Sequence, residues 1–334
     1  MSTQKQTSSI ARLLLGAFLV SIFIGSLSAS EGEQKKENAI RHVHDPCIIR
    51  QGDSYYVFST GPGILMRRSK DLIHWEFLGK AFSEDVPEWA KKEIPGSSNL
   101  WAPDIAYRHG RYYLYYSVST FGKNRSLIGL ATNKTLDPAS PDYEWKQEGK
   151  VVESFPNNDY NAIDSNVISL SRDQDALSFG SFWSGIKLVR IDSKTGKPAP
   201  GAPIVSLSQR PSPDAQEAPF MVRRGGYYYL FVSFDTCCRG VDSTYNIRVG
   251  RAKKIEGPFV DRDGKAMLDG GGTPVLATKG RYIGPGHCAI LQEKGRDLLV
   301  NHFYDGEAKG VPTLQVRPLS WDKAGWPGAG TPIE

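Results

Sequence analysis

The sequence of 334 residues lacks the features that mark several large classes of protein. It has no basic run and no RNA-recognition signature, so nucleic acid is not an expected partner. It has four cysteines but no pair spaced C-x₂-C, which argues against a zinc site. No segment after the N-terminal region shows the periodicity of a helix. The lack of a helical run is what an all-β fold would show.

The N-terminal region resembles a targeting segment. Lys5 and Arg12 precede an apolar run over residues 13–27, which is shorter than the ~20 residues of a membrane-spanning helix. We therefore predict a signal peptide over residues 1–30, a disordered spacer over 31–41, and a secreted or periplasmic protein without stable membrane association. An uncleaved membrane anchor is the alternative. Loss of Lys5 and Arg12 lowers the formal net charge from +5 to +3 (5 − 2), which is close to neutral.

One pattern returns along the chain at intervals of roughly 60 residues. It consists of a short apolar strand, a polar turn and a second strand rich in tyrosine. Complete copies begin at His44-Asp45-Pro46, Trp101-Ala102-Pro103 and Glu217-Ala218-Pro219, and each carries a tyrosine nine residues after its proline. Two weaker copies begin near Asp164 and His287. The chain is therefore predicted to be a repeat protein.

Several short strands per repeat and many turn residues, including 34 glycines and 21 prolines, indicate a five-bladed β-propeller over residues 42–334. Third strands are expected over residues 64–69, 127–132 and 247–252, and outer strands near 75–77, 143–145 and 257–259. A β-sandwich is the alternative, but it does not explain a start signal that returns with each repeat.

Three carboxylates lie at repeat starts: Asp45, Asp164 and Glu217. The first strand of each blade lies nearest the axis, so we expect these groups in register at one end of the central channel. Their repulsion should raise at least one pKa. Two carboxylates of different protonation state suit the hydrolysis of a glycosidic bond. The alternative is that such an aspartate only hydrogen-bonds its own turn. Asp104, outside this register, is interpreted either as a group that supports the catalytic carboxylates or as a structural group.

Aromatic and small polar residues near the repeat starts predict the walls of a pocket. Trp101 and Trp183 can stack on a sugar ring, although packing in the core explains them equally well. His287 lies at the start of the last repeat, where either a metal or a charge-balancing role is open.

Seven stretches in order resemble the arabinan endo-1,5-α-L-arabinosidases of glycoside hydrolase family 43. They are His44-Asp45-Pro46, Leu100-Trp101-Ala102-Pro103-Asp104, Ser117-Val118-Ser119-Thr120-Phe121-Gly122, Asn161-Ala162-Ile163-Asp164, Gly180-Ser181-Phe182-Trp183-Ser184-Gly185, Glu217-Ala218-Pro219-Phe220 and Gly284-Pro285-Gly286-His287. The resemblance covers nearly everything after residue 40. It implies a five-bladed propeller that cleaves internal α-1,5 bonds of arabinan with inversion.

By matching positions, the resemblance implies that Asp45 is the general base, Glu217 the general acid and Asp164 the group that raises the pKa of the acid and orients it. It also places His287 near a central calcium ion held largely through water. The expected substrate-binding residues are Trp101, Gly122, Asn161, Ala162, Ile163, Asp164, Ser181, Phe182 and Trp183.

Some choices stay open at this level. An exo-acting α-L-arabinofuranosidase or β-xylosidase of the same family, or a carbohydrate-binding propeller without catalysis, are the alternative functions. A monomer is expected. A bond between Cys47 and Cys288 is disfavoured by their offsets from the strand starts. Cys237 and Cys238 are adjacent, which is short for a disulfide, so a strained bond between them and buried free thiols both stay open.

Overall fold

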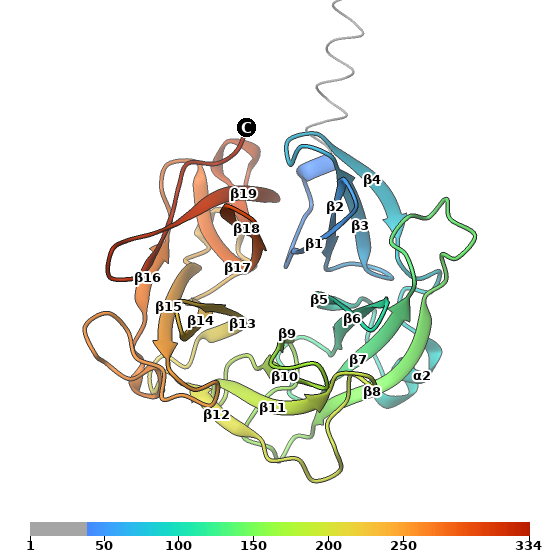
Figure 1. Cartoon of the computed structure of the whole chain (residues 1–334), viewed down its shortest axis with the longest axis horizontal. Helices are drawn as coiled ribbons and strands as arrows, with labels where there is room; N and C mark the ends of the chain where they lie inside the picture. The colour runs from blue at the N-terminus through green and yellow to red at the C-terminus, as the bar shows by residue number, and fades with distance from the viewer. Residues whose placement is uncertain (1–38) are drawn as a thin grey trace, which may run out of the picture.

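The computed structural model describes residues 39–334 and has five four-stranded antiparallel sheets arranged as blades around an axis (Figure 1). Each sheet uses four strands that follow one another in the chain. The predicted five-bladed β-propeller is confirmed.

The strands and helices have the following bounds. Blade 1 contains β1 (Cys47–Gln51), β2 (Ser54–Ser59), β3 (Leu65–Ser69) and β4 (Trp75–Lys80), and blade 2 contains β5 (Trp101–Arg108), β6 (Arg111–Val118), β7 (Ser126–Asn133) and β8 (Lys146–Ser154). Blade 3 contains β9 (Asn166–Ser169), β10 (Gln174–Phe179), β11 (Ile186–Asp192) and β12 (Val205–Ser208), and blade 4 contains β13 (Gln216–Arg224), β14 (Tyr227–Phe234), β15 (Asn246–Ala252) and β16 (Thr273–Leu276). Blade 5 contains β17 (Tyr282–Glu293), β18 (Arg296–Asp305), β19 (Val311–Trp321) and β20 (Pro327–Ala329). The connections hold α2 (Glu88–Glu93) and the 3₁₀ turns η1 (Gly240–Asp242), η2 (Met267–Asp269) and η3 (Gly306–Ala308).

The first strand of each blade lies nearest the axis, and β1, β5, β9, β13 and β17 contact one another in a closed ring (Figure 1). The repeated tyrosines explain part of this order. Tyr55, Tyr112 and Tyr228 pair with the equivalent residue of the first strand in their blades. Tyr55 and Tyr112 are buried at 5% exposure, so their rings fill the space between neighbouring blades.

The hydrophobic core is divided among the interfaces between blades. One cluster joins blades 1, 2 and 5, and three others join blades 2 and 3, 3 and 4, and 4 and 5. Each blade exposes two apolar faces that only a neighbouring blade can cover, so the ring is stabilised mainly by packing between blades.

Two of the predicted outer strands are wrong. The outer strand of blade 2 is β8, which begins after Trp145, and that of blade 4 is β16, which lies beyond Phe259. Tyr143 and Trp145 are apolar because they pack against the cluster of blades 1 and 2. Phe259 is buried at 1% exposure between blades 3 and 4. The remaining expected outer strand and the three expected third strands agree with β4, β3, β7 and β15.

The N-terminal segment closes the ring by pairing with blade 5. Val43 donates its N–H to the Pro312 carbonyl at 3.1 Å, and Arg41 forms an isolated bridge with Thr313. Ala39 is buried at 7% exposure. The predicted spacer is therefore wrong for residues 39–41, which pack on the propeller. The predicted signal peptide lies outside the described residues. Over residues 39–334, no helix has the length and apolar character needed to span a bilayer.

The four cysteines are one bonded pair and two free thiols. Cys237 and Cys238, for which both a bond and free thiols were open, are joined by a disulfide. In the turn after β14, Cys238 lies in the left-handed region, with φ of 68°. Cys47 and Cys288 are buried free thiols, as expected.

Candidate active site

The five blades begin with the same strained turn. Its central residue has a positive φ in every blade: Asp45 (51°), Ala102 (44°), Asp164 (59°), Ala218 (55°) and His287 (48°). A non-glycine residue in this region costs on the order of 1–3 kcal/mol, so the surrounding structure must hold it there.

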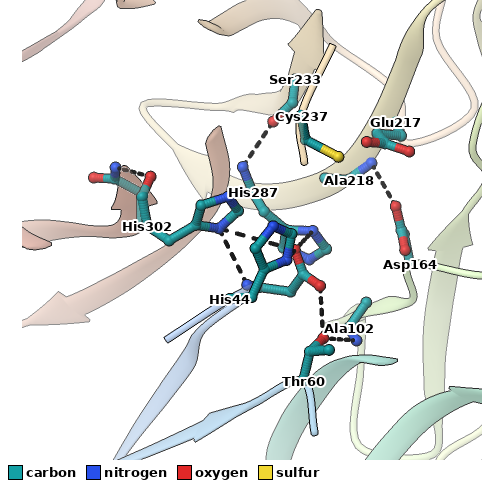
Figure 2. A network of polar contacts seen from close by, with 12 residues as sticks. His44, Thr60, Ala102, Asp164, Glu217, Ala218, Ser233, Cys237, His287 and His302 are labelled. Carbon is teal, nitrogen blue, oxygen red and sulfur yellow. Dashed lines mark hydrogen bonds and ion pairs between the residues drawn. The ribbon is translucent and has the colours of Figure 1, made fainter. Parts of the chain in front are cut away.

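The holding contacts are hydrogen bonds between neighbouring blades. The turn N–H groups of Ala102, Asp164 and His287 donate to hydroxyl groups of Thr60, Ser117 and Ser233 at 2.8–2.9 Å. The other two partners are a ring nitrogen of His302 for Asp45, at 3.1 Å, and a carboxylate oxygen of Asp164 for Ala218, at 3.2 Å. Figure 2 shows several of these contacts. The turns are thereby fixed by the assembled ring.

The hydroxyl partners were not predicted, although the sequence carries a signal for them. Thr60, Ser117 and Ser233 each lie five residues after the repeated tyrosine of their blade. The signal is a periodic hydroxyl at the end of an apolar strand.

The prediction that the three acids share one register is wrong for Glu217. Asp45 and Asp164 are the central residues of their turns, whereas Glu217 precedes the central residue Ala218. Trp101 has the corresponding place before Ala102. Glu217 thus reaches the site from the first residues of β13, where it also bridges to Ser181.

All three carboxylates line one cavity of about 860 Å³. Its wall from blades 2 and 3 includes Trp101, Gly122, Asn161, Ile163, Asp164, Ser181, Phe182 and Trp183, which are eight of the nine predicted substrate-binding residues. Ala162 is not part of the wall: it is fully buried, and its N–H donates to the hydroxyl of Ser154 at 2.9 Å. The prediction of a substrate contact at Ala162 is corrected accordingly. Phe121, 86% exposed, also lines the cavity.

Asp45 is held as a charged carboxylate. Burial alone would raise its pKa, but His44 and His287 hold the pKa well below its usual value. Their Nδ1 atoms lie 2.8 Å and 3.1 Å from Asp45 Oδ1, and Thr60 donates its hydroxyl to Oδ2 at 2.6 Å. His44 belongs to the stretch His44-Asp45-Pro46, but the sequence did not predict its contact with the Asp45 side chain.

Asp164 has the opposite electrostatic setting. Burial raises its pKa well above the usual value, and the neighbouring charges of Glu217 and Asp45 add to the rise while His287 opposes it. The expected rise of at least one pKa is thus found at Asp164. Figure 2 shows Asp164 and Glu217 on the same side of the site, apart from the group of His44, His287 and His302.

Glu217 is held by two hydroxyl groups. Ser181 donates to Oε2 at 2.6 Å, and Tyr245 donates to Oε1 at 2.7 Å. The Tyr245 ring fits only because residue 286 is glycine: a Cβ there would lie 1.9 Å from the ring. No sequence signal pointed to Tyr245, because its contact depends on packing between β15 and β17.

We predict that Tyr245→Phe lowers kcat about tenfold with little change in KM, because a hydrogen bond to a carboxylate that fixes its orientation is lost. Steady-state kinetics measure the effect. The control is Tyr113→Phe, whose hydroxyl donates to the Lys194 carbonyl away from the carboxylates, at 2.8 Å. Equal losses of activity in both variants would contradict a role for Tyr245 in orienting Glu217.

Asp104 links two neighbouring blades. It is buried and accepts hydrogen bonds from the Asn166 side chain at 3.2 Å and the Val167 N–H at 2.7 Å, which joins blades 2 and 3. Burial raises its pKa to about 7.

A raised pKa means that the folded state holds a proton that the unfolded state releases between about pH 4 and 7. The contribution of Asp104 to stability is therefore present below pH 4 and is lost as the pH rises through 7, by about 1.4 kcal/mol per pH unit. We expect Asp104→Asn to flatten this part of the pH profile in denaturant unfolding. Asp53→Asn, at a side chain 99% exposed, is the control and should leave the profile unchanged.

His287 balances the charge of the carboxylates. Its burial would lower its pKa, but Asp45, with contributions from Asp164 and Glu217, raises the pKa to about 9. The imidazole is thus positively charged at neutral pH.

The side chains at His287 do not fit a calcium ion held by protein ligands. Two groups of three residues in the described part of the chain have ligand atoms close enough together for a metal ion, His44–Cys237–Cys238 and His44–Asp45–His302, and neither includes His287. The first is not available, because its two cysteines form a disulfide and only a thiolate binds a metal. Calcium takes oxygen ligands, whereas His287 offers nitrogen and is paired with Asp45. The water-held ion stays a prediction, which elemental analysis of the purified protein tests.

Separate carboxylates in one aromatic-walled cavity define the kind of site that glycoside hydrolases use. The comparisons with known proteins agree with this class. The chain belongs to glycosyl hydrolases family 43, whose sequence pattern matches residues 38–327.

Named relatives share most of the fold. The chain is 44% identical over 297 residues to the extracellular exo-α-(1→5)-L-arabinofuranosidase ArbA of Cellvibrio japonicus, covering 85% of each chain. It is 42% identical over 293 residues to the extracellular endo-α-(1→5)-L-arabinanase 1 of Bacillus subtilis, covering 85% of this chain and 87% of the relative. A solved structure of a Cellvibrio cellulosa α-L-arabinanase complexed with arabinohexaose matches with a TM-score of 0.83 and 42% identity, over 87% of this chain and 96% of the other.

Proposed function

We propose that this family 43 hydrolase cleaves α-1,5-linked arabinan with inversion at the anomeric carbon. The observation that carries the proposal is the contrast between Asp45, whose pKa two histidines hold low, and Asp164, whose pKa is raised, with Glu217 in the same cavity. The relatives named above, which are an exo-arabinofuranosidase and arabinanases, support arabinan as the substrate.

Asp45 is proposed as the general base. A water on its side of the sugar attacks the anomeric carbon and passes a proton to the carboxylate. Thr60, His44 and His287 fix the orientation of the carboxylate, so the water is aligned without reorganisation during the reaction.

Glu217 is proposed as the general acid. It gives a proton to the leaving glycosidic oxygen as the bond breaks, and Ser181 and Tyr245 hold it in place. Asp164 accepts the N–H of Ala218, the residue after Glu217, and so fixes the turn that carries the acid.

Inversion is supported by the positions of the blades. Asp45 belongs to blade 1 and Glu217 to blade 4, which are not neighbours in the ring. Carboxyl groups on opposite sides of the channel leave room for a water, whereas a retaining enzyme needs its two groups about 5–5.5 Å apart. An early NMR spectrum of the products tests this, since inversion of an α-linked substrate yields the β-anomer first.

Internal cleavage is the proposed mode, and exo action is the second candidate because an exo-acting relative is among the matches. Sizing the early products from linear arabinan separates them. A ladder of oligomers supports internal cleavage, and release of a single short product from the start rejects it. No cleavage of linear arabinan, or of xylan and aryl arabinofuranosides, would leave the binding-propeller alternative.

We also propose secretion, which the extracellular names of two relatives support. N-terminal sequencing of the protein from culture medium or periplasm tests it, and a mature chain that starts near residue 31 is expected.

A further inference from the structure

The cavity has a second wall, built from blades 4 and 5, that is chemically unlike the aromatic one. The turn after β14 brings Cys237 and Cys238 to the cavity, opposite the residues of blades 2 and 3. Cys238 is exposed and Cys237 half-buried. In Figure 2 the Cys237 sulfur is directed toward the side of the site that carries Glu217.

The disulfide is held firmly beside the proposed base. Cys238 donates its N–H to the Tyr304 hydroxyl at 2.7 Å, and that hydroxyl lies 2.8 Å from His44 Nε2. The Cys238 sulfur lies 3.8 Å from the same nitrogen. Because the other ring nitrogen of His44 contacts Asp45, one imidazole ring separates the disulfide from the base.

The disulfide in this wall suits contact with the carbon-bound hydrogens of a sugar ring rather than hydrogen bonds with its hydroxyl groups. Disulfide sulfurs are weak hydrogen-bond acceptors and have no proton to donate. They therefore form only weak hydrogen bonds with water and present an apolar surface. A pentofuranose has carbon-bound hydrogens that pack on such a surface, while its hydroxyl groups reach the polar residues beside it.

We propose that the Cys237–Cys238 disulfide is a substrate-contacting surface of the active site, on which an arabinofuranose ring packs beside Asp45. The inference rests on the proposed function, and it names a substrate contact that is sensitive to reductant. A phosphine reductant and one water convert the disulfide into two thiols, and the phosphine becomes its oxide. Free thiols no longer share one fixed surface.

The test compares the wild type, the wild type treated with tris(2-carboxyethyl)phosphine and the variant Cys237→Ala/Cys238→Ala, with arabinohexaose as substrate. We expect KM to rise about five- to tenfold in the variant and in the reduced wild type, which corresponds to the loss of ~40–55 Å² of apolar contact. We expect kcat to stay within about twofold and the acidic limb of the pH profile to stay in place. Reductant should not change the variant further.

The control is Cys47→Ala/Cys288→Ala, which lacks the two buried free thiols and should respond to reductant as the wild type does. If the double alanine variant at 237 and 238 does not fold, as judged by circular dichroism, the reduced wild type carries the same test.

Three results would overturn the inference. An unchanged KM in both forms would exclude the contact. A fall in kcat at constant KM, with a shifted acidic limb, would show that the disulfide acts only on Asp45 through Tyr304 and His44. A wild type that does not hydrolyse arabinohexaose would refute the proposed function, and this inference with it, whereas hydrolysis with an unchanged KM refutes this inference alone.

Discussion

Replacing Glu217 with glutamine is expected to lower kcat on linear arabinan by about 10²–10⁴-fold or more, because the leaving oxygen then departs without a proton. Glutamine keeps the size of the side chain and can still bind the hydroxyls of Ser181 and Tyr245. The melting temperature and the affinity for arabino-oligosaccharides should therefore change little.

The choice of substrate makes this result specific to a general acid. A dinitrophenyl arabinofuranoside has a leaving group that needs no proton, so Glu217→Gln should retain much more of its activity on this compound than on arabinan. Steady-state kinetics on both substrates measure the ratio. Equal losses on the two substrates would contradict the assignment of Glu217.

Replacing Asp45 with asparagine is the second large effect we expect. The loss should again be about 10²–10⁴-fold or more, but equal on arabinan and on the activated aryl compound, because activation of water is needed with either leaving group. Asparagine also lacks the charge that pairs with His287, so the pKa of His287 should fall from about 9 toward its ordinary value.

An NMR titration of His287 in the Asp45→Asn variant tests whether the ion pair with Asp45 raises the pKa of His287. If activity is lost while the His287 pKa stays near 9, the ion pair with Asp45 is not what raises it. Near-normal activity of Asp45→Asn would reject Asp45 as the base. Asp164 or Asp104 would then be the next candidate.

Most of the propeller could be predicted because one residue type reports the strand order. The tyrosines at 55, 112 and 228 recur since each pairs with the first strand and fills the space between blades, so packing itself imposes the period. The outer strands carry no such constraint. At the rim, aromatic residues such as Tyr143 and Trp145 pack between blades without belonging to a strand. A prediction from apolar character alone therefore put the outer strand of blade 2 before the true position of β8.

The candidate site was predictable in its residues but not in its contacts. Asp45, Asp164 and Glu217 stand at repeat starts, and the propeller brings repeat starts to one cavity. The register difference of Glu217 depends on the backbone conformation of Ala218, which has no sequence signature because alanine seldom takes a positive φ. Tyr245 reaches Glu217 only through the space left by Gly286, a long-range fit that local patterns do not carry.

The joint between the first and last blades affects how the protein loses activity on heating. Each blade is made of consecutive strands, so no strand of one blade joins the other's sheet there. The joint is held by the pairing of residues 41–43 with blade 5, by hydrogen bonds of Glu293 with Arg50 and Tyr55, and by packing. Asp45 and His44 lie on the blade 1 side of the joint. Their partners lie on the blade 5 side: His302 and His287 contact Asp45, and Tyr304 contacts His44. Opening the joint by a small amount separates the base from His287 and His302 while every sheet remains intact and Thr60 and His44 stay beside it. Loss of activity on heating should thus precede the loss of the β-sheet signal in circular dichroism, because noncovalent contacts close the joint between blades 1 and 5.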